Sequence, residues 1–244
     1  MRISLSTYRI SPFVRVGEPI EPLYKPGSEW ARDAVKGLMH LNSDLLKEKR
    51  VDTSLFHNHD ELTSKTKPGY PLIIYHYNGG QFLVTGINEG AYAMDQLMAL
   101  YHGPVVASSR LIVGFSAQPP VVHEIEQKDH PQCYNLYNYL ALNSKIHKEF
   151  EQANAMQRIV MLEDAIAKHL EKDLFKYLNI ELPTPQPILL DLPIIHSALH
   201  TYKNHQYLSF NLKFSVNISL PNYLPLGNGK AMGFGILEKY SDAV

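Results

Sequence analysis

The stretch Tyr207-Leu-Ser-Phe-Asn-Leu-Lys-Phe-Ser-Val-Asn-Ile-Ser-Leu220 decides the fold of this chain. Every even-numbered position in it is apolar, and the odd-numbered positions from Ser209 to Ser219 are polar. Successive side chains of a β-strand point to opposite faces of the sheet, so this alternation predicts a long strand with one buried face. The chain has 244 residues, 45% of them hydrophobic, which is enough for one large domain or two small ones.

A glycine-rich segment follows this strand: Leu226-Gly-Asn-Gly-Lys-Ala-Met-Gly-Phe-Gly-Ile-Leu237. Glycine tolerates positive φ, and consecutive exposed amides around Lys230 would form an anion-binding concavity. A Rossmann fingerprint needs a helix after the glycines, but 234–237 is strand-like, and a Walker loop needs Ser or Thr where Ala231 stands. Nucleotide-binding enzymes of these classes are therefore disfavoured, and a plain long turn remains the alternative.

The first half of the chain has the pattern β-α-β-β-α-β, which is typical of a ferredoxin-like domain. On the first helix, Trp30, Ala34, Leu38 and Leu41 are expected to share the buried face. The hairpin surrounds Asn78-Gly-Gly, a strong turn signal. The predicted elements are a strand over 2–10, a helix over about 28–41, strands over 70–77 and 81–87, a helix over about 89–101 and strands within 105–126.

The second half starts after a polar run over 127–132 that contains Pro131. Its predicted elements are a strand over 134–142, a helix over about 154–178, strands over 188–192 and 196–202, and the strand of 207–220. We therefore expect an α+β fold of two tandem ferredoxin-like (RRM-like) domains with antiparallel sheets. The N-terminal domain would span 1–127, and the C-terminal domain, with the glycine-rich loop, 128–244.

The bulk composition excludes little. The net charge of −1 argues against a nucleic-acid binder, whose surface is usually basic, but residues 192–240 carry a net charge of +3. The single cysteine, Cys133, forbids an internal disulfide and suits a reducing compartment. No run approaches the roughly 18 apolar residues of a membrane span, and the N-terminus lacks the apolar core of a signal peptide. A cytoplasmic location is expected, with no membrane partner.

The end of the chain resembles the C-terminal signature of the repeat-associated (RAMP) proteins of CRISPR systems, in particular the endoribonucleases that process the CRISPR repeat transcript. In that family a strand of the type F-x-V-N-x-x-L-P enters a loop of the type G-L-G-K-x-x-S-x-G-F-G. The matching residues here are Phe214, Val216, Asn217, Leu220, Pro221 and the loop 226–235, with Asn228 and Ala231-Met232 as departures.

Three further blocks occur in the family's order, and the resemblance covers about residues 50–239. Ile74 stands where glutamine is usual and Tyr139 where tryptophan is usual. The blocks are Tyr70-Pro-Leu-Ile-Ile-Tyr75, Gly86-Ile-Asn-Glu-Gly90 and Leu140-Ala-Leu-Asn143.

The run Phe56-His57-Asn58-His59 contains the best catalytic candidates. In extended chain His57 and His59 would face the same way. From the residues alone, a solvated strand edge or a metal site with Asp60 are alternatives, although the metal site lacks a further ligand. The family resemblance implies metal-independent cleavage, in which the RNA 2′-hydroxyl attacks the adjacent phosphate and leaves a cyclic phosphate and a 5′-hydroxyl. Its H-x-H motif matches this pair, and histidine, with a pKa of about 6.5, can serve as both acid and base.

The resemblance implies further site residues. A catalytic tyrosine of the family falls on Tyr70, and Lys65 or Lys67 could supply positive charge, unless they are solvated loop lysines. The residues expected to contact RNA are Lys65, Lys67, Lys213, Gly227, Gly229, Lys230, Gly233 and Gly235. The expected partner is CRISPR repeat RNA, with effector-complex subunits and a second copy of the chain left open. No cofactor or metal is expected. The alternatives are a non-catalytic RNA-binding RAMP subunit and an unrelated α+β domain.

Overall fold

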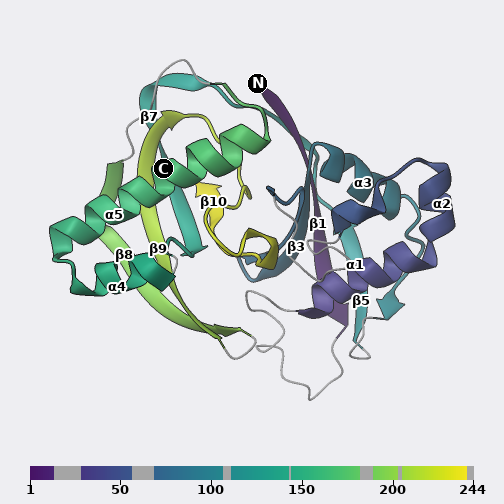
Figure 1. Ribbon diagram of the computed structural model, residues 1–244. Coiled ribbons are helices and arrows are strands. Elements are labelled where there is room, and N and C mark those ends of the chain that lie inside the picture. The colour runs from purple at the N-terminus through teal and green to yellow at the C-terminus, as the bar shows by residue number, and fades with distance from the viewer. Residues whose placement is uncertain are drawn as a thin grey trace. The chain divides into compact units, whose positions relative to one another are not determined.

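The computed structural model describes residues 1–13, 29–56, 69–106, 111–142, 144–181, 189–202 and 205–240 (Figure 1). The chain divides into two compact units, each with its own sheet. The N-terminal unit comprises Ile3–Val122 and Ala231–Gly233, and the C-terminal unit comprises Met1–Arg2, His123–Lys230 and Phe234–Val244. No helix among the described residues has the length and apolar composition needed to cross a membrane.

The N-terminal unit has strands in the order β2-β3-β1-β5-β4, and β6 also pairs with β1. The predicted hairpin is confirmed, with Asn78 paired to Gln81. The elements are β1 (Arg2–Phe13), α1 (Glu29–Leu41), α2 (Ser43–Glu48), a 3₁₀ turn (Thr53–Phe56), β2 (Ile73–Asn78), β3 (Gln81–Ile87), α3 (Glu89–Met98), β4 (Val105–Val106), β5 (Ile112–Ala117) and β6 (Val121–Glu124).

Helix α1 packs on this sheet through Trp30, Ala34 and Leu38, and the Trp30 and Phe82 ring centroids are 5.1 Å apart. The expectation that Leu41 shares this face is wrong, because its side chain is 78% exposed. Leu41 is the last residue of α1, where the chain turns into α2 and the Asn42 amide donates to the Met39 carbonyl. The apolar period of α1 continues to Leu41 in the sequence, but the face of the helix that packs on the sheet ends before this residue.

A small polar cluster lies inside this sheet. The Thr85 hydroxyl is 3.0 Å from both Thr7 Oγ1 and His76 Nε2, and all three side chains are buried. Burial lowers the pKa of His76 to about 3, because a charged imidazole there would lose its hydration. His76 is therefore neutral near pH 7.

The C-terminal unit has strands in the order β10-β7-β9-β8. Its elements are β7 (Gln127–Tyr139), α4 (Ser144–Gln152), α5 (Ala155–Lys168), a π-helix (His169–Phe175), β8 (Leu189–Tyr202), β9 (His205–Ile218) and β10 (Ile236–Lys239). Between β9 and β10, a 3₁₀ turn (Lys230–Met232) begins in this unit, and its last two residues are assigned to the N-terminal unit. Helix α4 contacts the sheet through Phe150, whose ring lies edge-on to Phe210, with centroids 5.4 Å apart.

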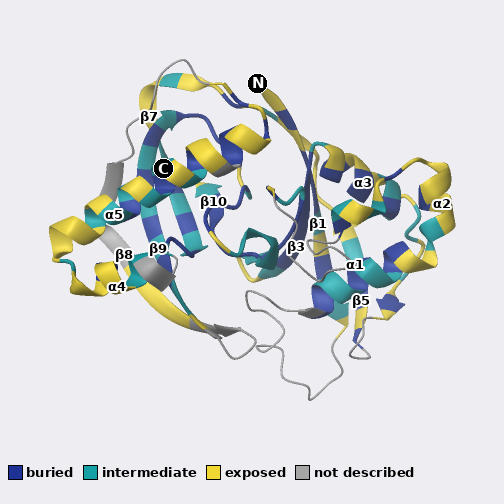
Figure 2. Ribbon diagram, viewed as in Figure 1, coloured by how far each residue is buried: buried dark blue, intermediate teal, exposed yellow. Residues whose placement is uncertain are grey.

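The alternation of the decisive strand is confirmed in β9. Phe210, Leu212 and Phe214 are each at most 2% exposed, whereas Asn211 and Lys213 between them are half-buried. Figure 2 shows this alternation along β9 and the exposed outer side of α5.

Two elements of the C-terminal unit differ in detail from the prediction. The runs 188–192 and 196–202 belong to one strand, β8, whose register with β9 shifts between Asp191 and Ile195. The predicted helix of 154–178 begins with a capping box, in which Asn154 and Gln157 each accept from the other's backbone amide. It changes to π-helical hydrogen bonding at His169. The apolar period is the same before and after His169, so the sequence pattern did not reveal the change.

Both sheets have the fourth-first-third-second strand order of a ferredoxin-like fold, with β5 and β10 as the respective fourth strands. In each sheet, the pairs formed by these four strands are antiparallel. The predicted fold class is therefore confirmed. Helix α3 connects the third and fourth strands of the N-terminal unit, whereas in the C-terminal unit the glycine-rich loop occupies that position.

Candidate functional site

The predicted catalytic histidines follow a buried anchor. Phe56 ends a 3₁₀ turn, is 1% exposed and belongs to the N-terminal core. The description resumes at Gly69, and Tyr70 is 7% exposed. The predicted residues His57, His59, Lys65 and Lys67 lie outside the described residues, so their roles remain predictions. Core residues therefore hold the chain directly before His57 and again at Tyr70.

Backbone hydrogen bonds hold the glycine-rich loop against the end of β7. The amides of Leu226, Asn228 and Gly235 donate to the carbonyls of Gly235, Leu140 and Asn138, with N–O distances of 2.8, 3.0 and 3.1 Å. Since these three amides already have acceptors, they do not contribute to an exposed anion-binding concavity, and the concavity suggested by the amides around Lys230 stays a prediction. The side chain of Asn228, between two of these amides, is exposed.

Gly227 and Gly235 show why the loop needs glycine. Gly235 has φ +69°, and a Cβ there would overlap the Leu226 carbonyl oxygen. Gly227 has φ +87°, and a Cβ would lie 2.6 Å from Tyr139 Cε2. Both positions combine left-handed backbone with close approach, which only glycine tolerates. The glycine spacing therefore has a structural explanation independent of any RNA contact.

The two predicted RNA-binding lysines of the C-terminal unit are half-buried and held locally. Lys230 Nζ donates to the Gly227 carbonyl at 2.7 Å. Lys213 Nζ lies 3.5 Å from the centroid of the Tyr240 ring, an arrangement that favours a cation. Lys213 pairs with Asn135 across β7 and β9, on the face opposite the apolar one. This polar sheet face therefore presents a positive charge at a fixed position.

Tyr139, which packs against Gly227 of the loop, forms a pair with His169. Tyr139 is fully buried, and its hydroxyl lies 2.6 Å from His169 Nδ1. The two rings meet edge-on at 5.7 Å. A tryptophan at position 139 would lack this hydroxyl. No motif in the sequence points to His169. Its only signal is helical spacing, since it lies seven residues after buried Leu162 and three after buried Ile166.

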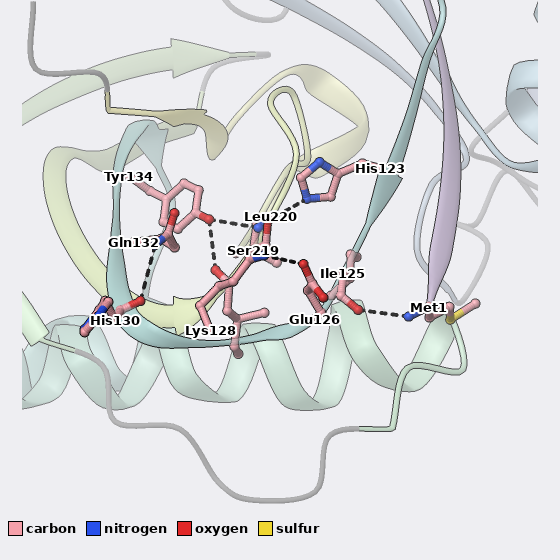
Figure 3. Close-up of polar contacts among 11 residues, drawn as sticks. Met1, His123, Ile125, Glu126, Lys128, His130, Gln132, Tyr134, Ser219 and Leu220 are labelled. Atoms are coloured by element: carbon pink, nitrogen blue, oxygen red, sulfur yellow. Dashed lines mark hydrogen bonds and ion pairs between the residues drawn. The ribbon is translucent and has the colours of Figure 1, made fainter.

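Another tyrosine, Tyr134, holds the chain at the end of β9, before the glycine-rich loop (Figure 3). Tyr134 Oη donates to the Ile218 carbonyl at 2.9 Å and accepts from the Leu220 amide at 2.8 Å. Burial raises the pKa of Tyr134 to about 12, so the hydroxyl keeps its proton. Beside it, Ser219 donates its amide to the Glu126 carbonyl, and its hydroxyl lies 3.1 Å from His123 Nε2. Burial lowers the pKa of His123.

Within the described part of the chain, no group of three His, Cys, Asp or Glu side chains is placed to hold a metal ion.

Sequence models of one protein family match both halves of the chain. The Cas6b N-terminal domain matches residues 39–107, and the Cas6b C-terminal domain matches residues 126–240. The chain belongs to the Cas6b family. The resemblance to CRISPR RNA-processing endoribonucleases of the RAMP type is thereby confirmed, and the alternative of an unrelated α+β domain is wrong.

Solved Cas6b structures share this fold. "Crystal structure of Cas6b" has 16% identity and a TM-score of 0.71, covering 98% of this chain and all of the other. "Crystal structure of CRISPR RNA processing endoribonuclease Cas6b" has 16% identity and a TM-score of 0.61, covering 97% of this chain and all of the other. "Csf5, CRISPR-Cas type IV Cas6 crRNA endonuclease" has 11% identity and a TM-score of 0.59, covering 99% and 100%. Among curated proteins, none matches.

The two Cas6b domains divide the predicted site residues between them. The N-terminal match includes His57, His59, Lys65, Lys67 and Tyr70. The C-terminal match includes Lys213 and the whole glycine-rich loop. The catalytic candidates therefore belong to the N-terminal domain of Cas6b together with Lys65 and Lys67, and the other RNA-contact candidates belong to the C-terminal domain.

Proposed function

We propose that this chain is a metal-independent endoribonuclease that cleaves CRISPR precursor RNA within its repeats. The observation that carries the proposal is the Cas6b N-terminal match over 39–107, which includes His57-Asn-His59. Two solved relatives of the same fold are described as a CRISPR RNA processing endoribonuclease and a crRNA endonuclease.

In the proposed reaction, the RNA 2′-oxygen attacks the adjacent phosphorus and the bond to the 5′-oxygen breaks. One histidine of the pair His57 and His59 removes the 2′-hydroxyl proton, and the other donates a proton to the leaving 5′-oxygen. The products are a 2′,3′-cyclic phosphate and a 5′-hydroxyl. Imidazole suits both transfers because both of its protonation states are populated near neutral pH, and each such catalyst contributes on the order of 10² to 10⁴ in rate.

The other predicted residues have supporting roles in this proposal. Tyr70 would orient a catalytic group, and Lys65 or Lys67 would stabilise the negative charge on the phosphorane. Lys213, on the polar face of the C-terminal sheet, and Lys230, in the glycine-rich loop, would hold the RNA backbone. Gly227, Gly229, Gly233 and Gly235 would let the loop adopt the conformation in which Lys230 meets the RNA. No cofactor takes part.

The mechanism is tested with a repeat RNA that carries a single 2′-deoxy nucleotide at the cleavage site. We expect the unmodified RNA to be cleaved equally with and without EDTA, leaving a cyclic phosphate, and the 2′-deoxy RNA to remain intact. Cleavage of the 2′-deoxy RNA, or its loss with EDTA, would contradict the mechanism. Replacing a 2′-hydroxyl far from the cleavage site is the control and should change nothing.

A second candidate function is a non-catalytic RNA-binding subunit of a CRISPR effector complex. The net charge of −1 and the departures at Asn228 and Ala231-Met232 favour it. The double variant His57→Ala/His59→Ala separates the two candidates. If the native chain cleaves and the variant only binds repeat RNA, the enzyme is supported. If both bind equally and neither cleaves, the subunit is supported. Light scattering with and without RNA would detect a homodimer.

A further inference from the structure

The C-terminal unit contains a cavity of about 350 Å³ that has no role in the function proposed above. It lies among the end of β7, helices α4 and α5, the first residue of the π-helix and the glycine-rich loop. Its volume is in the range of sites that take small organic groups. Side chains of Leu142, Ile146 and Met161, with Ala165, supply apolar walls.

The charged groups of this cavity favour a nucleobase over a phosphate. Two carboxylates line it, those of Glu149 and Asp164, and Lys168 is the single lysine or arginine among its described lining residues. Neither carboxylate has a hydrogen-bond or ion-pair partner in the described part of the chain. Carboxylates repel phosphate but accept hydrogen bonds from exocyclic amino groups, as in the pairing of Asp or Glu with cytosine N4. Apolar walls complement the faces of a base ring.

The cavity is continuous with the glycine-rich loop. Asn228 belongs to both, and its backbone amide and Nδ2 donate to the Leu140 carbonyl at 3.0 and 3.3 Å. His169, on the opposite side, is oriented by the hydroxyl of Tyr139, the residue that packs against Gly227. If that hydroxyl donates, the neutral imidazole carries its proton on Nε2. RNA held on the loop would therefore have a base-sized site next to its backbone, with fixed polar groups.

We propose that this cavity binds one unpaired RNA base with an amino group at adenine N6 or cytosine N4, in preference to uracil, which has a carbonyl oxygen at the corresponding position. The inference rests on the proposed function, since it assumes an RNA that reaches the glycine-rich loop. Asp164 and Glu149 would accept from the amino group, and uracil, which has a carbonyl oxygen at that position, would face two carboxylates with an acceptor.

The test measures binding without cleavage. The full-length His57→Ala/His59→Ala chain is titrated into fluorescent ten-nucleotide oligomers of A, C or U at one fixed salt concentration, because affinity for RNA depends on salt. We expect A and C oligomers to bind roughly ten-fold more tightly than U, the discrimination typical of one good base contact. Adding Asp164→Asn should reduce the ratio to about three or less, and Ala165→Trp should fill the cavity and abolish it.

Glu171→Gln is the matched control, since it removes an exposed carboxylate from the same helical run outside the cavity, and it should keep the ratio. A ratio near one in the parent, or a ratio unchanged by Asp164→Asn, would overturn the inference, and so would failure to bind any oligomer. Cleavage of repeat RNA by the chain with intact histidines is measured in parallel. Cleavage without base selectivity refutes only the inference, and selectivity without cleavage refutes only the proposed function.

Discussion

The two units of this chain have the same strand order but differ in what connects the third strand to the fourth. In the N-terminal unit the connection is α3, which buries Ala91, Met94 and Leu97. In the C-terminal unit it is the irregular glycine-rich loop, which buries Leu226 and Phe234 to 1% exposure or less. A loop can therefore cover one sheet as a helix covers the other, provided that its backbone groups find partners.

The comparison also shows a shared requirement for close backbone approach. At the start of α3, a Cβ on Gly90 would overlap the Leu72 carbonyl oxygen, just as one on Gly235 would overlap that of Leu226. In both α3 and the glycine-rich loop, the chain therefore contacts another backbone segment at a glycine. The helix needs this at its entry, whereas the loop needs it at several positions, so the glycine pattern of the loop is the longer of the two in the sequence.

The largest expected effect comes from adding a side chain where the backbone at Gly235 passes close to Leu226. Gly235→Ala should lower the free energy of unfolding by about 3 kcal/mol or more, because it adds an overlap with Leu226 to a strained φ. Urea denaturation measures it. Gly79→Ala, in the β2–β3 turn with φ +54° and open space around its Cβ, is the control and should cost only about 1 kcal/mol. Equal effects would show that the loop is not tightly packed.

Truncating a buried leucine in each connection compares the loop with the helix. Leu226→Ala and Leu97→Ala should each cost about 3 kcal/mol, since both side chains are fully buried and each substitution leaves a cavity. Chemical denaturation followed by tryptophan fluorescence and circular dichroism would report both losses. A much smaller cost for Leu226→Ala would mean that the loop is a surface turn and not part of a core.

Acid should affect the two sheets differently because of His76. The unfolded histidine binds a proton below about pH 6.5, whereas folded His76 resists protonation until about pH 3. In this window the unfolded state binds more protons, so stability falls as the pH falls. His76 alone should lower the free energy of unfolding by about 2 kcal/mol between pH 7 and pH 5.

The measurement is urea denaturation at both pH values, with hydrogen exchange to locate the effect in β1, β2 and β3. In His76→Gln this part of the pH dependence should be absent. His130→Gln, at an exposed position of β7, should keep the native dependence. If His76→Gln keeps it as well, the imidazole is not held neutral by burial.

The smallest expected effect is at the pair Tyr139 and His169. Tyr139→Phe removes the hydrogen bond to His169 and should cost about 1 kcal/mol, with the ring packing against Gly227 retained. Tyr177→Phe, at an exposed position after the π-helix, is the control and should be neutral. Thermal unfolding would resolve the difference, and a neutral Tyr139→Phe would show that the pair contributes no net stability.

Local patterns predicted much of the fold, because each depends on neighbours in the chain. The hairpin at Asn78-Gly79-Gly80 and the alternation of β9 need only short-range geometry. Leu41 was misplaced because periodicity does not say where a neighbouring surface ends. For the candidate site, the sequence supplied His57 and His59 through a family motif, and the membership is confirmed. Their roles remain predictions.

What the sequence by itself determined is the fold class, the Cas6b membership and the location of the glycine-rich loop, since strand alternation and motif order are written along the chain. Only the tertiary structure decided that His169 meets Tyr139, thirty residues away, that the amides of Leu226, Asn228 and Gly235 are occupied, and that Asn228 borders a cavity. Such contacts depend on strand register and on the angle at which a helix crosses its sheet, and no local period encodes either.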